Sequence, residues 1–72
     1  MITNKARSYY HNIEDELISF YEEEGNKLSD RNLFIQTSIK FGDRMLKDVS
    51  IPLGLEFGEC TVGAIALMKE HK

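Results

Sequence analysis

The chain has 72 residues, of which 42% are hydrophobic and 29% are charged, with a net charge of −3, one cysteine and one proline. These numbers exclude several domains, because a domain needs at least about 50 residues. They also exclude a disordered or low-complexity chain, since the apolar fraction is ordinary and proline is rare. We therefore expect residues 1–72 to form a single domain.

Small size limits how much apolar surface a lone chain can bury. A domain of this length buries only roughly 60% of its unfolded surface, so small domains gain stability from disulfides, metals or self-association. Cys60 is the single cysteine and has no partner for an internal disulfide. No set of residues has the spacing of metal ligands, so we expect no metal and no cofactor. Self-association remains, and the sequence predicts a homo-oligomer.

Charge and hydropathy bear on location and partners. Residues 1–7 lack the apolar core of a signal peptide, and the longest apolar or small run, 62–68, is far shorter than a membrane span. A lone thiol then favours the cytoplasm. Residues 1–25 carry two basic and six acidic side chains, a net charge of −4, whereas residues 26–72 carry seven and six, a net charge of +1. This overall acidity argues against a nucleic-acid-binding protein.

The first segment has the periodicity of an amphipathic helix, which we predict over residues 3–24. Its apolar residues recur at spacings of three and four and share one stripe about 120° wide. Thr3 or Asn4 can cap the start, and Gly25 with Asn26 is typical of a left-handed helix stop. The stripe consists of Ile2, Ala6, Tyr9, Tyr10, Ile13, Leu17, Phe20 and Tyr21.

A second helix is predicted over residues 30–47, with Ser29 as its N-cap. Its apolar arc spans roughly 160°, which is wide enough to contact two neighbours. Ser38 and Gly42 lie within this arc and allow a close approach of another element. The opposite face carries a basic ridge of three residues, Lys40, Arg44 and Lys47.

The third segment fits either a helix or a hairpin. Residues 51–57 alternate with the period of a strand, and Gly58 with Glu59 could turn the chain into a second strand over 60–68. Two alanines and an acid-to-base charge order favour a helix over residues 59–70 instead. Residues 51–57 stay open between strand, loop and helix.

The predicted fold class is therefore all-α: a compact three-helix domain, with helices at about 3–24, 30–47 and 59–70, assembled as a homo-oligomer. The alternative is two helices plus a C-terminal β-hairpin. The third helix is apolar or small on nearly every side, as in a buried helix. A monomer of 72 residues has too little other mass to surround it, so we expect it to pack against copies of itself or of the second helix.

The chain lacks the combinations of side chains that catalysis needs. Cys60 lies in the most apolar segment, where a thiol stays protonated and inert. Asp15 and Glu16 are adjacent on a helix and point apart. The glycines match neither the dinucleotide-binding fingerprint nor the phosphate-binding loop. We therefore expect no enzyme, but a non-catalytic small binding protein.

Two surfaces carry groups that could bind a ligand. Arg7, Tyr10 and His11 lie at i, i+3 and i+4 of the first helix, where they can stack a base and bind a phosphate. The second surface is the basic ridge. If the two converge across a subunit boundary, they form a cationic pocket that suits a nucleotide anion. Alternatively, Tyr10 lies at the edge of the core with its hydroxyl at the surface, and the basic ridge is a solvated face.

The stretch Arg7-Ser8-Tyr9-Tyr10-His11 resembles the opening of the small helical-hairpin sponge proteins of phages, of the anti-CBASS and anti-Thoeris type. These viral proteins are compact helical homo-oligomers that bind cyclic-nucleotide signals and so blunt host antiviral defence. The resemblance implies a base-stacking role for Tyr10, with a basic residue of the second helix on the phosphates.

Two functions follow as hypotheses. In the first, the protein is a phage-type inhibitor that sequesters a nucleotide immune signal at subunit interfaces. In the alternative, it is a protein-interaction inhibitor or regulator that docks its acidic first helix on a basic host protein. The acidic residues 22–24 crowd the end of that helix, where the backbone carbonyls already carry partial negative charge. Either solvent or basic side chains must therefore cover this end.

Overall fold

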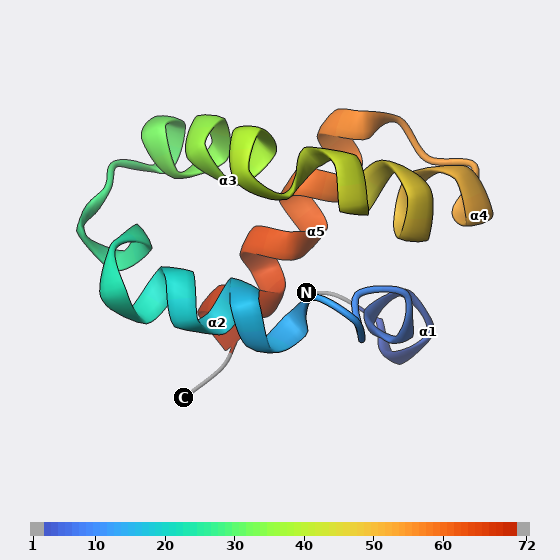
Figure 1. Cartoon of the computed structure of the whole chain (residues 1–72), viewed down its shortest axis with the longest axis horizontal. Coiled ribbons are helices and arrows are strands. Elements are labelled where there is room, and N and C mark those ends of the chain that lie inside the picture. Colours follow the sequence, from blue (N-terminus) through green and yellow to red (C-terminus); the bar gives the residue numbers. More distant parts are fainter. Residues whose placement is uncertain (1–2, 71–72) are drawn as a thin grey trace.

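Three helices of ten or more residues enclose the core of this protein (Figure 1). The computed structural model describes residues 3–70; Ile2, which was placed in the apolar stripe of the first predicted helix, lies outside them. Between residues 3 and 70 the regular structure is entirely helical. The all-α class is confirmed, and the alternative of a C-terminal β-hairpin is wrong for this range.

The first predicted helix is in fact two helices, so the single helix over residues 3–24 is wrong. Helix α1 spans Asn4–Ser8 and helix α2 spans Glu14–Glu23. Thr3 does cap α1, because its Oγ1 accepts a hydrogen bond from the Ala6 amide at 3.1 Å. In the turn from residue 9 to 13, backbone amides bond to carbonyls three residues earlier, which is tighter than an α-helix.

The size of the core explains the break. A straight helix over residues 3–24 would be roughly 33 Å long, whereas the whole fold measures 31 × 22 × 19 Å. Such a helix would carry one end of its apolar stripe beyond the core. The turn brings Tyr10, Ile13 and Leu17 into the core together, and all three are buried.

Gly25 follows α2, but it does not have the left-handed conformation that was predicted. Instead it opens a short 3-10 turn, Gly25–Lys27, with an ordinary φ angle. The residue is buried, and a Cβ atom there would lie 3.0 Å from Leu33 Cδ1 and 3.1 Å from Tyr21 Cδ1. Glycine at this position therefore allows Leu33 and Tyr21 to pack closely against the backbone.

The second predicted helix extends beyond residue 47. Helix α3 spans Asp30–Met45 and continues through a π-helical turn, Leu46–Ser50, into the short helix α4, Ile51–Leu53. Its N-cap is confirmed, since Ser29 Oγ accepts from the Asn32 amide at 3.2 Å. The run ends at Gly54, which adopts a left-handed φ of 67° and so favours glycine.

Helix α5, Phe57–Glu70, starts two residues before the predicted position. It crosses α3 and also contacts α2, as Figure 1 shows. Ser38 and Gly42, where a close backbone approach was predicted, contact side chains of α5. Ser38 Oγ lies 2.9 Å from Thr61 Oγ1, and a Cβ on Gly42 would lie 3.1 Å from Phe57 Cζ.

The described part of the chain has no single helix with the length and hydropathy of a membrane span. The segments Asp30–Leu53 and Phe57–Glu70 meet that requirement only when they are taken together, and they are bent by 106° relative to each other.

The core draws on all three long helices, but it leaves part of the apolar surface uncovered. Val62 of α5 is 58% exposed and Ile39 of α3 is 73% exposed. The helix predicted to be buried on all sides is therefore covered on only part of its surface by this chain. The buried apolar residues are Tyr10, Ile13, Leu17, Phe20, Leu33, Phe41, Met45, Val49, Cys60, Ala64, Leu67 and Met68.

The packing of Tyr10 against α5 can be tested by a substitution at Gly63. A methyl group there would lie 2.5 Å from Tyr10 Oη, and overpacking a filled core costs about 1–3 kcal/mol. Relative to Gly58→Ala, which changes helix propensity without this contact, Gly63→Ala should lower the free energy of unfolding by that amount, measured by urea unfolding and circular dichroism.

Gly58→Ala in the same helix is the matched control. The nearest atom to a Cβ there is Phe34 Cζ at 3.9 Å, so we expect no loss and a gain of up to about 1 kcal/mol from helix propensity. Equal losses in Gly63→Ala and Gly58→Ala would contradict the tight packing at Tyr10.

Candidate functional site

Tyr10, the residue predicted to stack a base, is in the core. Its side chain is 2% exposed, and its hydroxyl donates a hydrogen bond to the Cys60 carbonyl oxygen at 2.7 Å. Burial, with a smaller contribution from Cys60, raises the pKa of Tyr10 far above its ordinary value. Neither the ring nor the hydroxyl is presented to a ligand in the single chain.

The two neighbours of Tyr10 in that predicted site lie at the surface. Arg7 Nη2 forms an ion pair with Glu70 Oε2 at 3.0 Å, which ties α1 to the last turn of α5. His11 is exposed in the turn between α1 and α2. The helix break therefore separates the guanidinium, phenol and imidazole that a continuous helix would have aligned.

The basic ridge faces α2 rather than the Tyr10 region. Arg44 Nη1 forms an ion pair with Glu16 Oε2 at 2.6 Å, and Lys40 Nζ lies 5.5 Å from the centre of the Phe20 ring. Lys47 is exposed. Within one chain the six predicted ligand-binding residues do not form one pocket, and their convergence across a subunit boundary stays a prediction.

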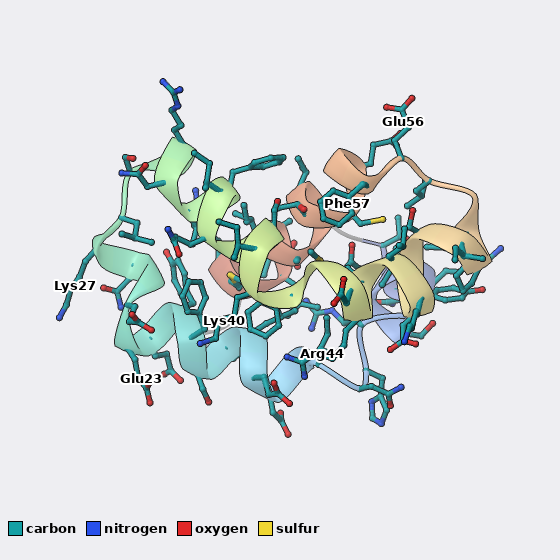
Figure 2. The ribbon with its side chains drawn as sticks, turned by 45° about the horizontal axis from the view of Figure 1, so that its top comes forward. Glu23, Lys27, Lys40, Arg44, Glu56 and Phe57 are labelled. Atoms are coloured by element: carbon teal, nitrogen blue, oxygen red, sulfur yellow. The ribbon has the colours of Figure 1, made fainter. Side chains whose placement is uncertain are left out.

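A hollow of about 300 Å³ lies between α2 and the basic ridge. We call it the α2 hollow; Glu23 and Lys40, two of its residues, are labelled in Figure 2. At its base the Phe20 ring packs edge-on against Phe41, with ring centres 5.9 Å apart. The residues that line it are Asp15, Glu16, Ser19, Phe20, Glu23, Glu24 and Lys40.

Four carboxylates and one ammonium group surround the α2 hollow, so it is negatively charged at neutral pH. Glu16 is paired with Arg44. Asp15, Glu23 and Glu24 make no ion pair within residues 3–70. The site can therefore attract a cation from outside the chain.

A second concave surface, of about 680 Å³, lies over α5 and is largely apolar. We call it the α5 groove. Its lining is mostly small or apolar, with two carboxylates, and consists of Thr3, Ala6, Phe34, Glu56, Gly58, Glu59, Val62, Gly63 and Ala66.

Sequence reasoning found the parts of the α2 hollow but not the site itself. The acidic helix, the basic ridge and Phe20 were each recognised from periodicity. The contact of Lys40 with the Phe20 ring joins residues twenty positions apart, and it depends on how α3 crosses α2. The order of apolar positions within each helix does not determine that crossing.

Comparison with protein-family models, with curated proteins and with solved structures finds no match to this chain. Within residues 3–70 no three histidine, cysteine or acidic side chains are grouped as metal ligands.

The buried hydroxyl of Tyr10 predicts how the protein responds to alkali. Because burial raises its pKa, Tyr10 stays neutral in the folded chain while it ionises in the unfolded chain above about pH 10. The stabilisation that neutral Tyr10 provides is complete below that pH and is lost as the pH rises beyond it. We expect Tyr10→Phe to weaken the pH dependence of the unfolding free energy in this range.

The measurement compares phenolate absorbance with helical circular dichroism during alkaline titration of the wild type and of Tyr10→Phe. The wild type has one phenolate more than Tyr10→Phe, and the absorbance of this extra phenolate should appear only when the helical circular dichroism is lost. Its appearance while the protein is still fully helical would contradict the burial of this side chain.

Proposed function

We propose that this chain is a protein-interaction module that docks its α2 hollow on a basic surface of a partner protein. The observation that carries the proposal is the set of three carboxylates, Asp15, Glu23 and Glu24, which surround a defined hollow and make no ion pair within residues 3–70. In this function the chain acts by covering its partner's surface, as an inhibitor or regulator does.

The chemistry of the α2 hollow suits an arginine or lysine side chain. A guanidinium group can bind carboxylates through two parallel hydrogen bonds, which gives orientation as well as energy. The aromatic base of the hollow, Phe20, already has the Lys40 ammonium group at 5.5 Å from its ring centre. Because this ring is buried and already has Lys40 over it, an incoming cation would be held by the surrounding carboxylates.

The position of the carboxylates at the end of α2 supports the same function. Glu22, Glu23 and Glu24 are exposed where the helix already carries partial negative charge. A basic partner relieves both the mutual repulsion of these side chains and their unfavourable interaction with the helix. Docking therefore adds a favourable electrostatic contribution that the isolated chain lacks.

The nucleotide-sequestering hypothesis stays a prediction, and the geometry supports it less. Its stacking residue, Tyr10, is enclosed in the core, and Arg7 and Arg44 are each paired with a carboxylate of this chain. The negative α2 hollow would also repel a phosphate.

An arginine-rich peptide of about a dozen residues is the probe for the docking function, with binding followed by fluorescence anisotropy. Glu23→Gln combined with Glu24→Gln should weaken binding about tenfold, because two exposed ion pairs together contribute about 1.4 kcal/mol. Binding should also weaken as salt is raised from low to physiological concentration.

Glu56→Gln combined with Glu59→Gln is the matched control, since it removes the same charge from the α5 groove. Figure 2 shows Glu23 and Glu56 at opposite ends of the molecule. The control should retain binding within about twofold. A tenfold loss in both double variants would show attraction by net charge alone and would overturn docking at the α2 hollow.

A further inference from the structure

An uncovered apolar strip runs along α3 on the side away from α2. Ile35, Ile39, Gly42 and Leu46 follow one another at spacings of four, three and four, the pattern of a helix that packs along another helix. Ile39 is 73% exposed and Leu46 is 45% exposed. We call these four residues, with Phe57 and Ile51 beside them, the α3 seam.

The π-helical turn extends the α3 seam beyond α3 itself. The Ile51 amide bonds to the Leu46 carbonyl oxygen, which places Ile51 about one turn beyond Leu46. Ile51 is 69% exposed. The apolar strip therefore continues into α4.

The α3 seam contains a hollow as well as protruding side chains. Gly42 has no side chain, and the Phe57 ring lies so close that a Cβ atom would be 3.1 Å from its Cζ. Phe57 is 40% exposed, so its ring forms an apolar floor there. One turn away, Ile39 is the most exposed large apolar residue among residues 3–70.

These features are complementary to their own copy when two α3 helices lie antiparallel. With a two-fold axis midway between positions 40 and 41, Ile39 of each copy faces the partner's Gly42, and Ile35 faces the partner's Leu46. The protruding isoleucine then meets the hollow and the Phe57 floor, and each contact occurs twice, as a closed dimer requires. We propose that a second copy of this chain docks on the α3 seam in this antiparallel register.

The exposed area is what such a dimer needs. With on the order of 200 Å² for a large apolar side chain, the exposed fractions in the α3 seam leave roughly 500 Å² of apolar surface. A standard interface buries about 800 Å² per partner, of which roughly 60% is apolar. The exposed fractions are 40%, 73%, 45%, 69% and 40% for Ile35, Ile39, Leu46, Ile51 and Phe57.

Two basic side chains of α3 point away from this strip. Lys40 and Arg44 contact Phe20 and Glu16 of α2, and in Figure 2 they lie on the opposite side of α3 from Phe57. A second copy on the α3 seam therefore leaves both α2 hollows accessible. The dimer goes beyond the proposed docking function and does not depend on it.

Light scattering at micromolar concentration tests the dimer. We expect the wild type to have about twice the mass of the 8.3 kDa chain, and Ile39→Glu to have the mass of one chain with its helical circular dichroism retained. Val62→Glu is the matched control, because Val62 is 58% exposed on α5 outside the α3 seam, and it should keep the wild-type mass. A wild type of single-chain mass, or an Ile39→Glu mass equal to the wild type, would overturn the proposal.

Cysteine cross-linking tests the register. Single variants Ile35→Cys and Leu46→Cys, mixed and oxidised, should form the mixed disulfide at least about tenfold more than either variant alone forms its own, because these positions face each other only in the antiparallel arrangement. The native Cys60 is buried and stays outside the reaction. Cross-links within each single variant that equal or exceed the mixed product would overturn the antiparallel register.

Discussion

The hydrogen bond from the Tyr10 hydroxyl to the Cys60 carbonyl oxygen lies inside the core and joins two residues that are 50 positions apart in the chain. It fixes the turn between α1 and α2 against the first turns of α5. The ring reaches this position because Gly63, one turn further along α5, has no side chain to block it. An unpaired buried hydroxyl would cost about 1–3 kcal/mol, so the bond also explains why a tyrosine is tolerated there.

Tyr10 lies just after α1, so its contact with α5 fixes where the first helix ends. The arrangement of the other helices depends on that position. Because the chain turns after α1, α2 is a separate, shorter helix that packs against α3. Phe20 of α2 contacts Phe41 of α3. This contact places the acidic residues of α2 beside the basic ridge and forms the α2 hollow. Another side of α3 meets the first turns of α5, through Thr61 and Phe57. The α3 seam stays largely exposed beside that contact. Both proposed interaction surfaces therefore result from one packing arrangement.

Much of this fold could be predicted from periodicity and capping. The all-α class, the Thr3 and Ser29 caps and the approach at Ser38 and Gly42 all follow from short-range patterns. The break at residues 9–13 could not be predicted, because no glycine or proline marks it. A continuous stripe satisfied every local rule, and only the size of the core rejects a helix of that length.

The candidate sites show the same division. The acidity of the first third of the chain was evident from its charge count, and the basic ridge from the spacing of its residues. Their pairing depends on the crossing of α3 over α2. The largest difference between the sequence-based hypothesis and the structure concerns Tyr10. An Arg-Ser-Tyr-Tyr-His stretch has the chemistry of a nucleotide site, whereas the structure uses its second tyrosine for packing. The residue type indicated that this side chain could stack on a base, whereas the tertiary fold places its hydroxyl on the Cys60 carbonyl oxygen.

Nitration by tetranitromethane tests directly whether the Tyr10 ring is enclosed in the core of the folded protein. In a chain with Tyr9→Phe and Tyr21→Phe, Tyr10 is the single tyrosine, so mass spectrometry reports on this ring alone. If the ring is buried in the core, we expect no nitration while the protein is folded and complete nitration after unfolding in denaturant. Rapid nitration of the fully helical protein would contradict a core built around Tyr10 and would restore this ring as a ligand-binding group.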